Sequence, residues 1–185
     1  KHIPAMKPYV SGTGSPMYYA SRIAKKKYPN AKVVFVGPCI AKRKEAQRDE
    51  CVDYVITFEE LHSIFRGFGI ELAQANPYKV AYESVCEAHG FAQAGGVAGA
   101  VKAYLGPKAD GIKMLQFSDF NKKSIGQMRA WAKTGKVDAQ FIEMMACEGG
   151  CVTGPSAYND SVSGKRQLNQ DLLKRTLKYE NYKEQ

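Results

Sequence analysis

The sequence has no hydrophobic run long enough to cross a membrane. A membrane span needs ~18–20 consecutive apolar residues, and no stretch of the 185 residues approaches that length. The opening Lys1-His2-Ile3-Pro4 is followed by no apolar segment, so no secretion signal is recognisable. Internal repeats and low-complexity segments are also absent. We therefore expect a globular protein of the cytoplasm without a membrane partner.

The composition also argues against a fold that depends on disulfide bonds. The chain has five cysteines, an odd number, and it is long enough to bury a hydrophobic core without cross-links. This pattern is typical of a reducing compartment, where thiols serve metal or redox chemistry.

The net charge of +9 raises the possibility of nucleic-acid binding. Much of the excess lies in Lys25-Lys26-Lys27 and in the tail after Gly164, and such runs are more often the solvated face of a helix. No RNP-type, zinc-finger or helix-turn-helix motif accompanies them. The charge alone is therefore a weak indication, and a basic nucleic-acid-binding domain stays a third hypothesis that rests on it alone.

The hydrophobic pattern predicts alternating strands and helices. Ser15-Pro16 is a typical helix start, and Thr57 with Glu60 forms a capping box. The predicted helices are 16–27, 39–47, 57–66, 92–105, 121–133 and 167 to the end, and the predicted strands are 31–36, 52–56, 112–117 and 141–145. This order favours an α/β fold of parallel strands flanked by helices.

Two cysteine motifs directly follow predicted strands. Cys39 comes after strand 31–36 and Gly37-Pro38, and Cys147 comes after strand 141–145. Ligand sites of open α/β sheets lie beyond the carboxyl ends of the strands. Cys39 also stands where a helix is predicted to begin, and amide dipoles there stabilise a thiolate.

The second motif, Ala146-Cys147-Glu148-Gly149-Gly150-Cys151, is suited to an iron–sulfur cluster. Its two glycines allow the backbone to curve and to turn amide groups toward a cluster. A 4Fe–4S cluster usually has four cysteine ligands, and Cys39, Cys147 and Cys151 supply three candidates. Two buried structural cysteines would explain the spacing of this motif alone equally well. Cys51 and Cys86 lack such surroundings and are interpreted as core or bystander thiols.

Several segments resemble the FeFe (iron-only) hydrogenases. Pro38-Cys39-Ile40-Ala41-Lys42-Arg43-Lys44-Glu45 is similar to the family's second signature, and Glu143-Met144-Met145-Ala146-Cys147-Glu148-Gly149-Gly150-Cys151 is similar to its third. Asp53 to Thr57 and Phe91 to Val97 resemble two further family segments and occur in the same order. The resemblance extends to about Pro155 and implies the two-lobed catalytic domain of the large subunit.

The resemblance also implies roles for individual residues. Cys39, Cys147 and Cys151 match ligands of the 4Fe–4S part of the H-cluster, and Cys151 matches the thiolate that bridges to the two-iron subsite. Lys42 matches a lysine that pairs with an iron-bound cyanide, and Met145 matches a methionine beside the two-iron subsite. Pro38 adjoins this pocket. The alternative for Lys42 is a solvent-facing helix position, which its register with Cys39 disfavours. A core position would fit Met145 at least as well when it is taken alone, and Glu45 and Glu143 are interpreted as structural.

The sequence departs from the family pattern in ways that define our expectations. The first signature, Thr-Ser-Cys-Cys-Pro-x-Trp, is absent, and it would supply the fourth cubane ligand. We therefore expect a fragment that begins just after this signature and that is by itself inactive and without the cluster. Gly37, the stretch Ser15-Pro16-Met17-Tyr18 and the stretch Gly154-Pro155-Ser156 also differ from the prototypical enzymes, as in the family's divergent, sensory branch.

These observations define two main hypotheses. In the first, residues 1–164 form part of an H-cluster domain that interconverts dihydrogen with protons and electrons, or senses hydrogen, and 165–185 form a helical tail or a connector to a signalling module. Its electron carrier would be a protein such as ferredoxin. In the second, a hydrogenase-like protein keeps the 4Fe–4S cluster without the two-iron site and acts in cluster assembly or electron transfer.

Overall fold

The computed structural model describes residues 3–76, 78, 84–175 and 177–179. They form two compact units, each assembled from separate stretches of the chain. Unit 1 contains the described residues of Lys1–Val10, Lys79–Thr153 and Asn159–Gln185, and unit 2 contains those of Ser11–Tyr78 and Gly154–Tyr158. Each unit has a two-stranded parallel sheet. The predicted α/β class, with parallel strands, helices and two lobes, is therefore confirmed.

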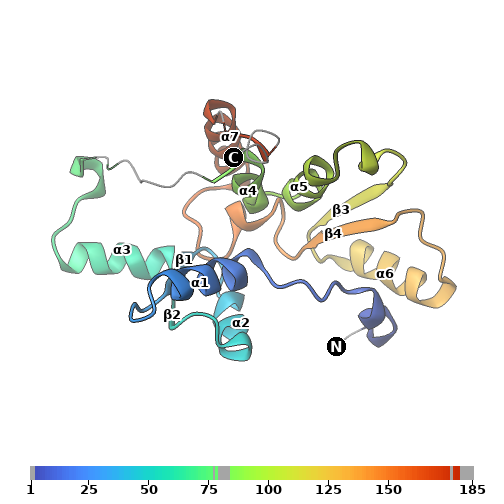
Figure 1. Cartoon of the computed structure of the whole chain (residues 1–185), viewed down its shortest axis with the longest axis horizontal. Helices are drawn as coiled ribbons and strands as arrows, with labels where there is room; N and C mark the ends of the chain where they lie inside the picture. Colours follow the sequence, from blue (N-terminus) through green and yellow to red (C-terminus); the bar gives the residue numbers. More distant parts are fainter. Residues whose placement is uncertain (1–2, 77, 79–83, 176, 180–185) are drawn as a thin grey trace. The chain divides into compact units, whose positions relative to one another are not determined.

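Unit 2 is built on strands β1 and β2 (Figure 1). Its elements are α1 (Pro16–Lys27), β1 (Val34–Gly37), α2 (Ala41–Asp49), β2 (Tyr54–Thr57), α3 (Phe58–Gly67) and the 3-10 helix η2 (Leu72–Gln74). Val34 pairs with Tyr54 and Gly37 with Thr57. Both strands thus end at one edge of the sheet, and Cys39 follows β1 at this edge.

The core of unit 2 lies between its sheet and α1. Met17 of α1 is buried together with Cys51 and Val52, and Phe35 and Val55 from the two strands pack against them. Because Phe35 and Val55 are partners in the register, they point to the same face of the sheet. Burial of these side chains fixes where β1 ends, and so fixes the start of the Cys39 segment.

The predicted helix caps of unit 2 are confirmed. Ser15 accepts a hydrogen bond from the backbone N–H of Tyr18 at the start of α1. Thr57 and Glu60 form a reciprocal capping box at the start of α3. The hydrogen bond from the Thr57 backbone N–H, together with the guanidinium of Arg43, lowers the pKa of Glu60 below its usual value. Arg43 thereby links α2 to α3.

Unit 1 contains the second pair of strands and the helices around it. Its elements are η1 (Pro4–Tyr9), α4 (Cys86–His89), η3 (Gly90–Ala92), α5 (Gly96–Leu105), η4 (Gly106–Ala109), β3 (Met114–Ser118), α6 (Lys122–Thr134), β4 (Phe141–Met145), η5 (Cys151–Thr153) and α7 (Ser161–Lys174). Met114 pairs with Phe141 and Ser118 with Met145. Cys147 therefore follows the carboxyl end of a parallel strand.

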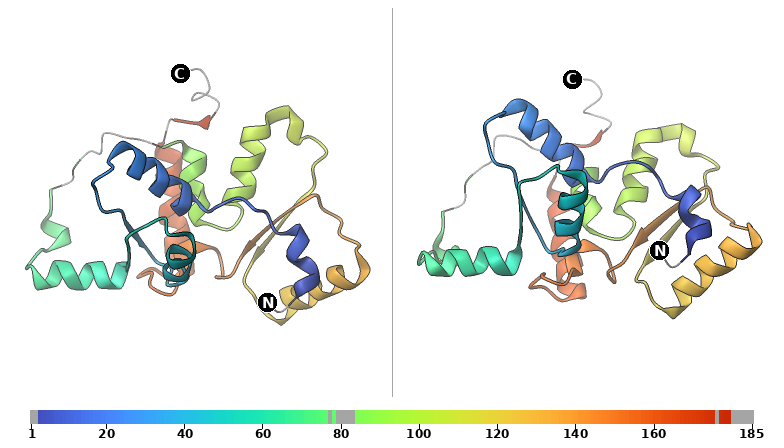
Figure 2. Two further views of the ribbon diagram at one scale, coloured as in Figure 1. Left: turned by 60° about the horizontal axis from the view of Figure 1, so that its bottom comes forward. Right: turned by 90° about the horizontal axis from the view of Figure 1, so that it is seen from below.

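Helices cover both sides of this second sheet, as Figures 1 and 2 show for α5 and α6. On the α6 side, Trp131 is 7% exposed, and its ring meets Phe117 of β3 edge to face with centroids 5.4 Å apart. Ala98 of α5 is also buried. The prediction that Trp131 lies on the apolar face of its helix is confirmed.

Several predicted helix boundaries were wrong. Helix α2 begins at Ala41 and not at Cys39, because Cys39 and Ile40 form a turn in which the Cys39 carbonyl accepts from Lys42 N–H at 3.2 Å. Helix α5 begins at Gly96 and not at Ala92, because Gly95 at φ +89° interrupts the helix. Helix α7 begins at Ser161 and not at Gln167, because Asp160 accepts from Val162 and Ser163 N–H. It ends at Lys174 and does not continue to the end of the chain, because the backbone of Arg175 is extended.

The expected boundary between 164 and 165 falls inside α7. The division into an H-cluster domain and a connector stays a prediction, and residues 176 and 180–185 of that tail lie outside the described residues. Within the part of the chain that the structure describes, no helix is long and apolar enough to span a membrane.

Candidate functional site

Cys39 lies in the turn between β1 and α2. It is half-buried and follows Pro38, whose carbonyl accepts a hydrogen bond from Ser156 N–H at 3.1 Å. Ser156 is buried and belongs to Gly154–Tyr158, the short stretch that returns to unit 2 shortly after Cys151. The Pro38-Cys39 turn is thus held by the sheet, by α2 and by this returning stretch.

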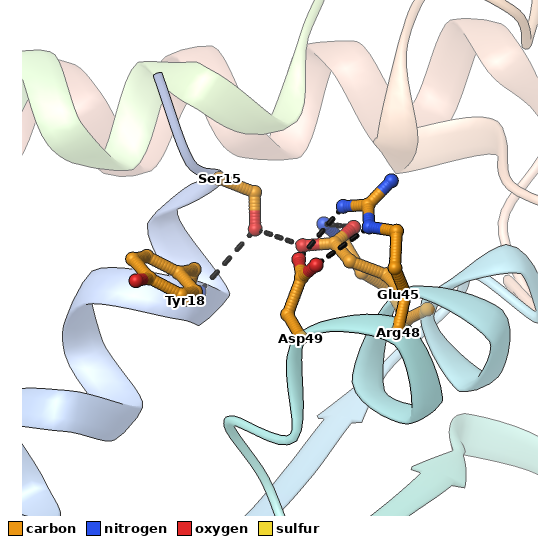
Figure 3. A network of polar contacts seen from close by, with 6 residues as sticks. Ser15, Tyr18, Glu45, Arg48 and Asp49 are labelled. Atoms are coloured by element: carbon orange, nitrogen blue, oxygen red, sulfur yellow. Dashed lines mark hydrogen bonds and ion pairs between the residues drawn. The ribbon is translucent and has the colours of Figure 1, made fainter. Parts of the chain in front are cut away.

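Lys42 is held by a polar network that links α1 and α2 (Figure 3). Its ammonium donates to Glu45 at 2.6 Å, and both side chains are about one-fifth exposed, at 21% and 18%. The second oxygen of Glu45 accepts from the hydroxyl of Ser15, the cap of α1. The network fixes the Lys42 ammonium against Glu45, while two of its three N–H donors can serve another acceptor.

Met145 and Cys147 extend from the end of β4 in unit 1. The Met145 carbonyl accepts from Asp119 N–H at 3.0 Å, which continues the pairing of β3 and β4 past the last strand residue. Met145 and Cys147 are half-buried and Cys151 is exposed. Two of the predicted ligands, Cys147 and Cys151, therefore lie on a single loop that begins at the edge of the sheet.

The loop between these cysteines is curved by its two glycines. Gly149 has φ +78° and Gly150 has φ +105°, and both are buried. Gly150 N–H donates to the Cys147 carbonyl at 3.1 Å, and the Gly149 carbonyl accepts from Ala94 N–H at 3.0 Å. A Cβ at Gly150 would lie 2.6 Å from the Ala94 nitrogen. Only glycine fits this close approach of two backbones.

Glu143 positions the loop against which these glycines pack. Its buried carboxylate, 6% exposed, accepts from Gly95 N–H at 2.9 Å and from Ala98 N–H at 2.7 Å. A carboxylate at this place satisfies amides of the first turn of α5 and complements the helix dipole. The structural interpretation of Glu143 agrees with this geometry.

The two remaining cysteines lie elsewhere. Cys51 is 4% exposed in the core of unit 2. Cys86 begins α4, and its thiol donates to the Leu172 carbonyl at 3.5 Å. Both thus serve packing within their own unit.

The thiols fit an iron–sulfur cluster by their chemistry. Thiolates are the ligands of such clusters, and the glycine turn provides a backbone that can wrap one. Cys39 belongs to unit 2, whereas Cys147 and Cys151 belong to unit 1. Among the described residues no three His, Cys, Asp or Glu side chains are grouped to hold a metal ion. The predicted set of Pro38, Cys39, Lys42, Met145, Cys147 and Cys151 therefore stays a prediction.

Sequence reasoning missed the contact between Ser15 and Glu45. The two residues are 30 positions apart, and each has a local explanation, one as a helix cap and the other as a partner of Lys42. No sequence signal joins them.

Comparison with known families decides the classification. Residues 1–155 match the family described as iron only hydrogenase large subunit, C-terminal domain. The chain belongs to this family. The match covers both cysteine motifs and the Phe91 to Val97 segment.

Solved iron-only hydrogenases have the same fold. A structure on the oxygen inactivation of [FeFe]-hydrogenase, through modification and degradation of the H cluster 2Fe subcluster, matches with a TM-score of 0.60 at 21% identity over 93% of this chain and 60% of that one. A structure on stepwise H-cluster assembly, HydA(deltaEFG), matches with a TM-score of 0.61 at 22% identity. The match covers 93% of this chain and 61% of that one. A variant of the [FeFe]-hydrogenase HydA1 from Chlamydomonas reinhardtii matches with a TM-score of 0.61 at 20% identity. The match covers 95% of this chain and 63% of that one. The chain thus spans about three-fifths of these structures.

The close approach of the Gly149–Gly150 turn to the Gln93–Ala94 backbone makes Gly150 sensitive to substitution. We expect Gly150→Ala to lower the free energy of unfolding by more than Gly135→Ala does. Both glycines have positive φ, but a Cβ at Gly135 meets nothing within 4 Å, whereas one at Gly150 meets the Gln93–Ala94 backbone. Gly135→Ala should cost roughly 1–2 kcal/mol, and Gly150→Ala should cost several. Chemical denaturation followed by circular dichroism measures both, and equal losses would contradict the proposed packing.

The pair of Lys42 and Glu45 should be energetically coupled. A double-mutant cycle with Lys42→Met and Glu45→Ala is expected to give a coupling of roughly 1.5–3 kcal/mol, because the two groups are mostly buried and charged. The same cycle on Arg48 and Asp49 is the control: that pair is equally close, at 2.5 Å, but Arg48 is 73% exposed. Equal coupling energies in the two cycles would contradict the conclusion that Glu45 fixes the position of the Lys42 ammonium.

Proposed function

We propose that this chain is part of the H-cluster domain of an iron-only hydrogenase or a hydrogen sensor. The established family membership gives the class of protein. The observation that carries the specific proposal is that Cys39 and Cys147 each follow the carboxyl end of a parallel strand. Ligand sites of α/β sheets are built at such ends.

In this proposal Cys39, Cys147 and Cys151 hold the 4Fe–4S part of the cluster. When bound, the cluster supplies the cleavage and formation of dihydrogen together with storage of the electrons. The protein contributes thiolate ligands, a fixed cation and a shielded surface. A 4Fe–4S cluster usually has four cysteine ligands, and these three residues supply all but one of them, so the chain alone is expected to be inactive and without the cluster.

Lys42 and Met145 are proposed to serve the two-iron subsite. The ammonium of Lys42 keeps N–H donors for an anionic ligand while Glu45 fixes its place. Met145, at the end of β4, offers a soft apolar side chain that excludes water. Pro38 sets the direction of the chain into Cys39.

The alternative is a 4Fe–4S protein without a two-iron subsite. A network that fixes the ammonium of Lys42, three residues after Cys39, disfavours it, because a simple cubane needs no such lysine. The sensory role rests on the departures at Gly37, Ser15–Tyr18 and Gly154–Ser156. A ferredoxin-like electron carrier, a signalling module as partner and a location in the cytoplasm complete the proposal.

The decisive experiment uses the intact parent protein with a two-iron subsite inserted anaerobically. We expect infrared bands of iron-bound carbonyl and cyanide together with hydrogen turnover. Lys42→Met should shift the cyanide bands, because it removes their proposed hydrogen-bond donor. Lys44→Met, on the exposed side of the same helix, should leave them in place.

Two results would count against the proposal. A cubane signal without carbonyl and cyanide bands would favour the alternative. Absence of both the cubane signal and the bands would rule out an H-cluster in this protein.

A further inference from the structure

Helix α7 packs unusually closely on the segment that follows the cysteine loop. Gly164 of α7 is buried, and a Cβ at this position would lie 3.3 Å from the Cβ of Asn159 and 3.4 Å from the Val152 carbonyl oxygen. Val152 belongs to η5, the turn that begins at Cys151. The missing side chain at Gly164 therefore lets the helix lie against η5 within unit 1.

This packing brings the next residue, Lys165, onto the cysteine loop. Its ammonium nitrogen lies 2.6 Å from the position that a Cβ on Gly149 would occupy. Lys165 is half-buried and Gly149 is buried. The side chain therefore covers the backbone of Gly149, between Cys147 and Cys151.

The ammonium of Lys165 has no carboxylate partner within the described part of the chain. Within the residues that the structure describes, no Asp or Glu oxygen lies within ion-pairing distance of its ammonium, in contrast to Lys42 and Lys113. A lysine whose charge is neutralised by a neighbouring carboxylate contributes little electric field at the cysteine loop. A lysine without such a partner contributes the field of its full charge there.

We propose that Lys165 raises the reduction potential of the iron–sulfur cluster held by Cys147 and Cys151. The inference rests on the proposed function, because it needs a cluster on this loop. A one-electron reduction adds one negative charge to the cluster and its thiolates. A cation on the loop that carries two of the thiolates stabilises the reduced form more than the oxidised form, and partial burial reduces the screening of this effect by solvent.

A purely structural role would leave the potential unchanged. In that case only the aliphatic stem of Lys165 would matter, as a cover for Gly149. Lys165→Gln tests the difference because it removes the charge and keeps a long polar side chain. Lys165→Arg keeps the charge. Arg166→Gln is the matched control: it removes one positive charge from the exposed neighbouring position of the same helix.

The measurement is a redox titration of the reconstituted parent protein at a mediated electrode, followed by the electron paramagnetic resonance of the reduced cluster. We expect Lys165→Gln to lower the equilibrium constant for reduction by about threefold or more, which is about 28 mV at 59 mV per tenfold change. Lys165→Arg should stay at the wild-type potential, and Arg166→Gln should shift it distinctly less.

The outcomes separate the inference from the proposed function. If the wild-type protein takes up the cluster and Lys165→Gln shifts its potential no more than Arg166→Gln, this inference is wrong and the proposed function stands. A wild-type parent that takes up no cluster overturns both. Should Lys165→Gln fail to take up the cluster, Lys165→Met is titrated in its place, with the same shift expected and an unchanged potential as the contrary result.

Discussion

The contact on which the candidate site depends most is the approach of the Gly149–Gly150 turn to the backbone of Gln93 and Ala94. Two main chains meet there with no room for a Cβ, and a hydrogen bond from Ala94 to Gly149 joins them. The turn sets the directions in which Cys147 and Cys151 leave the loop. Glu143 of β4 supports this arrangement. Its carboxylate accepts hydrogen bonds from the amides of Gly95 and Ala98 and so fixes the backbone that opposes the glycine turn.

Two lysines are placed by different means around the cysteine motifs. Lys42 is held by an acid, Glu45, which is itself held by the cap of α1. Lys165 is placed by the close packing of Gly164 and has no paired acid among the residues described. A paired cation offers hydrogen bonds at a fixed position and little long-range field, whereas an unpaired one offers field. This difference suits the proposed roles, one toward a bound anion and the other toward the charge of the cluster.

The sequence was most informative where the determinants are local. The apolar run of β4 predicted Phe141–Met145 with the observed bounds, and Ser15-Pro16 and Thr57 with Glu60 predicted two helix starts. Prediction failed where a single residue interrupts or caps a helix, as Gly95 does before α5 and Asp160 before α7. The contacts from Ser15 to Glu45 and from Lys165 to Gly149 join distant positions through tertiary packing, so no local pattern could reveal them. The proposed ligands came from motif resemblance, since spacing alone left buried structural cysteines as an equal explanation.

The central claim is that Cys39, Cys147 and Cys151 bind one cluster, and the chain contains its own controls in Cys51 and Cys86. The most direct measurement is the iron content per chain of the intact parent protein after anaerobic reconstitution, in single cysteine variants. Cys39→Ser, Cys147→Ser and Cys151→Ser should each lose most of the cubane iron, because each removes a thiolate ligand. Cys51→Ala and Cys86→Ala should keep it. Undiminished iron in any of the three serine variants, or equal loss in all five variants, would contradict the account.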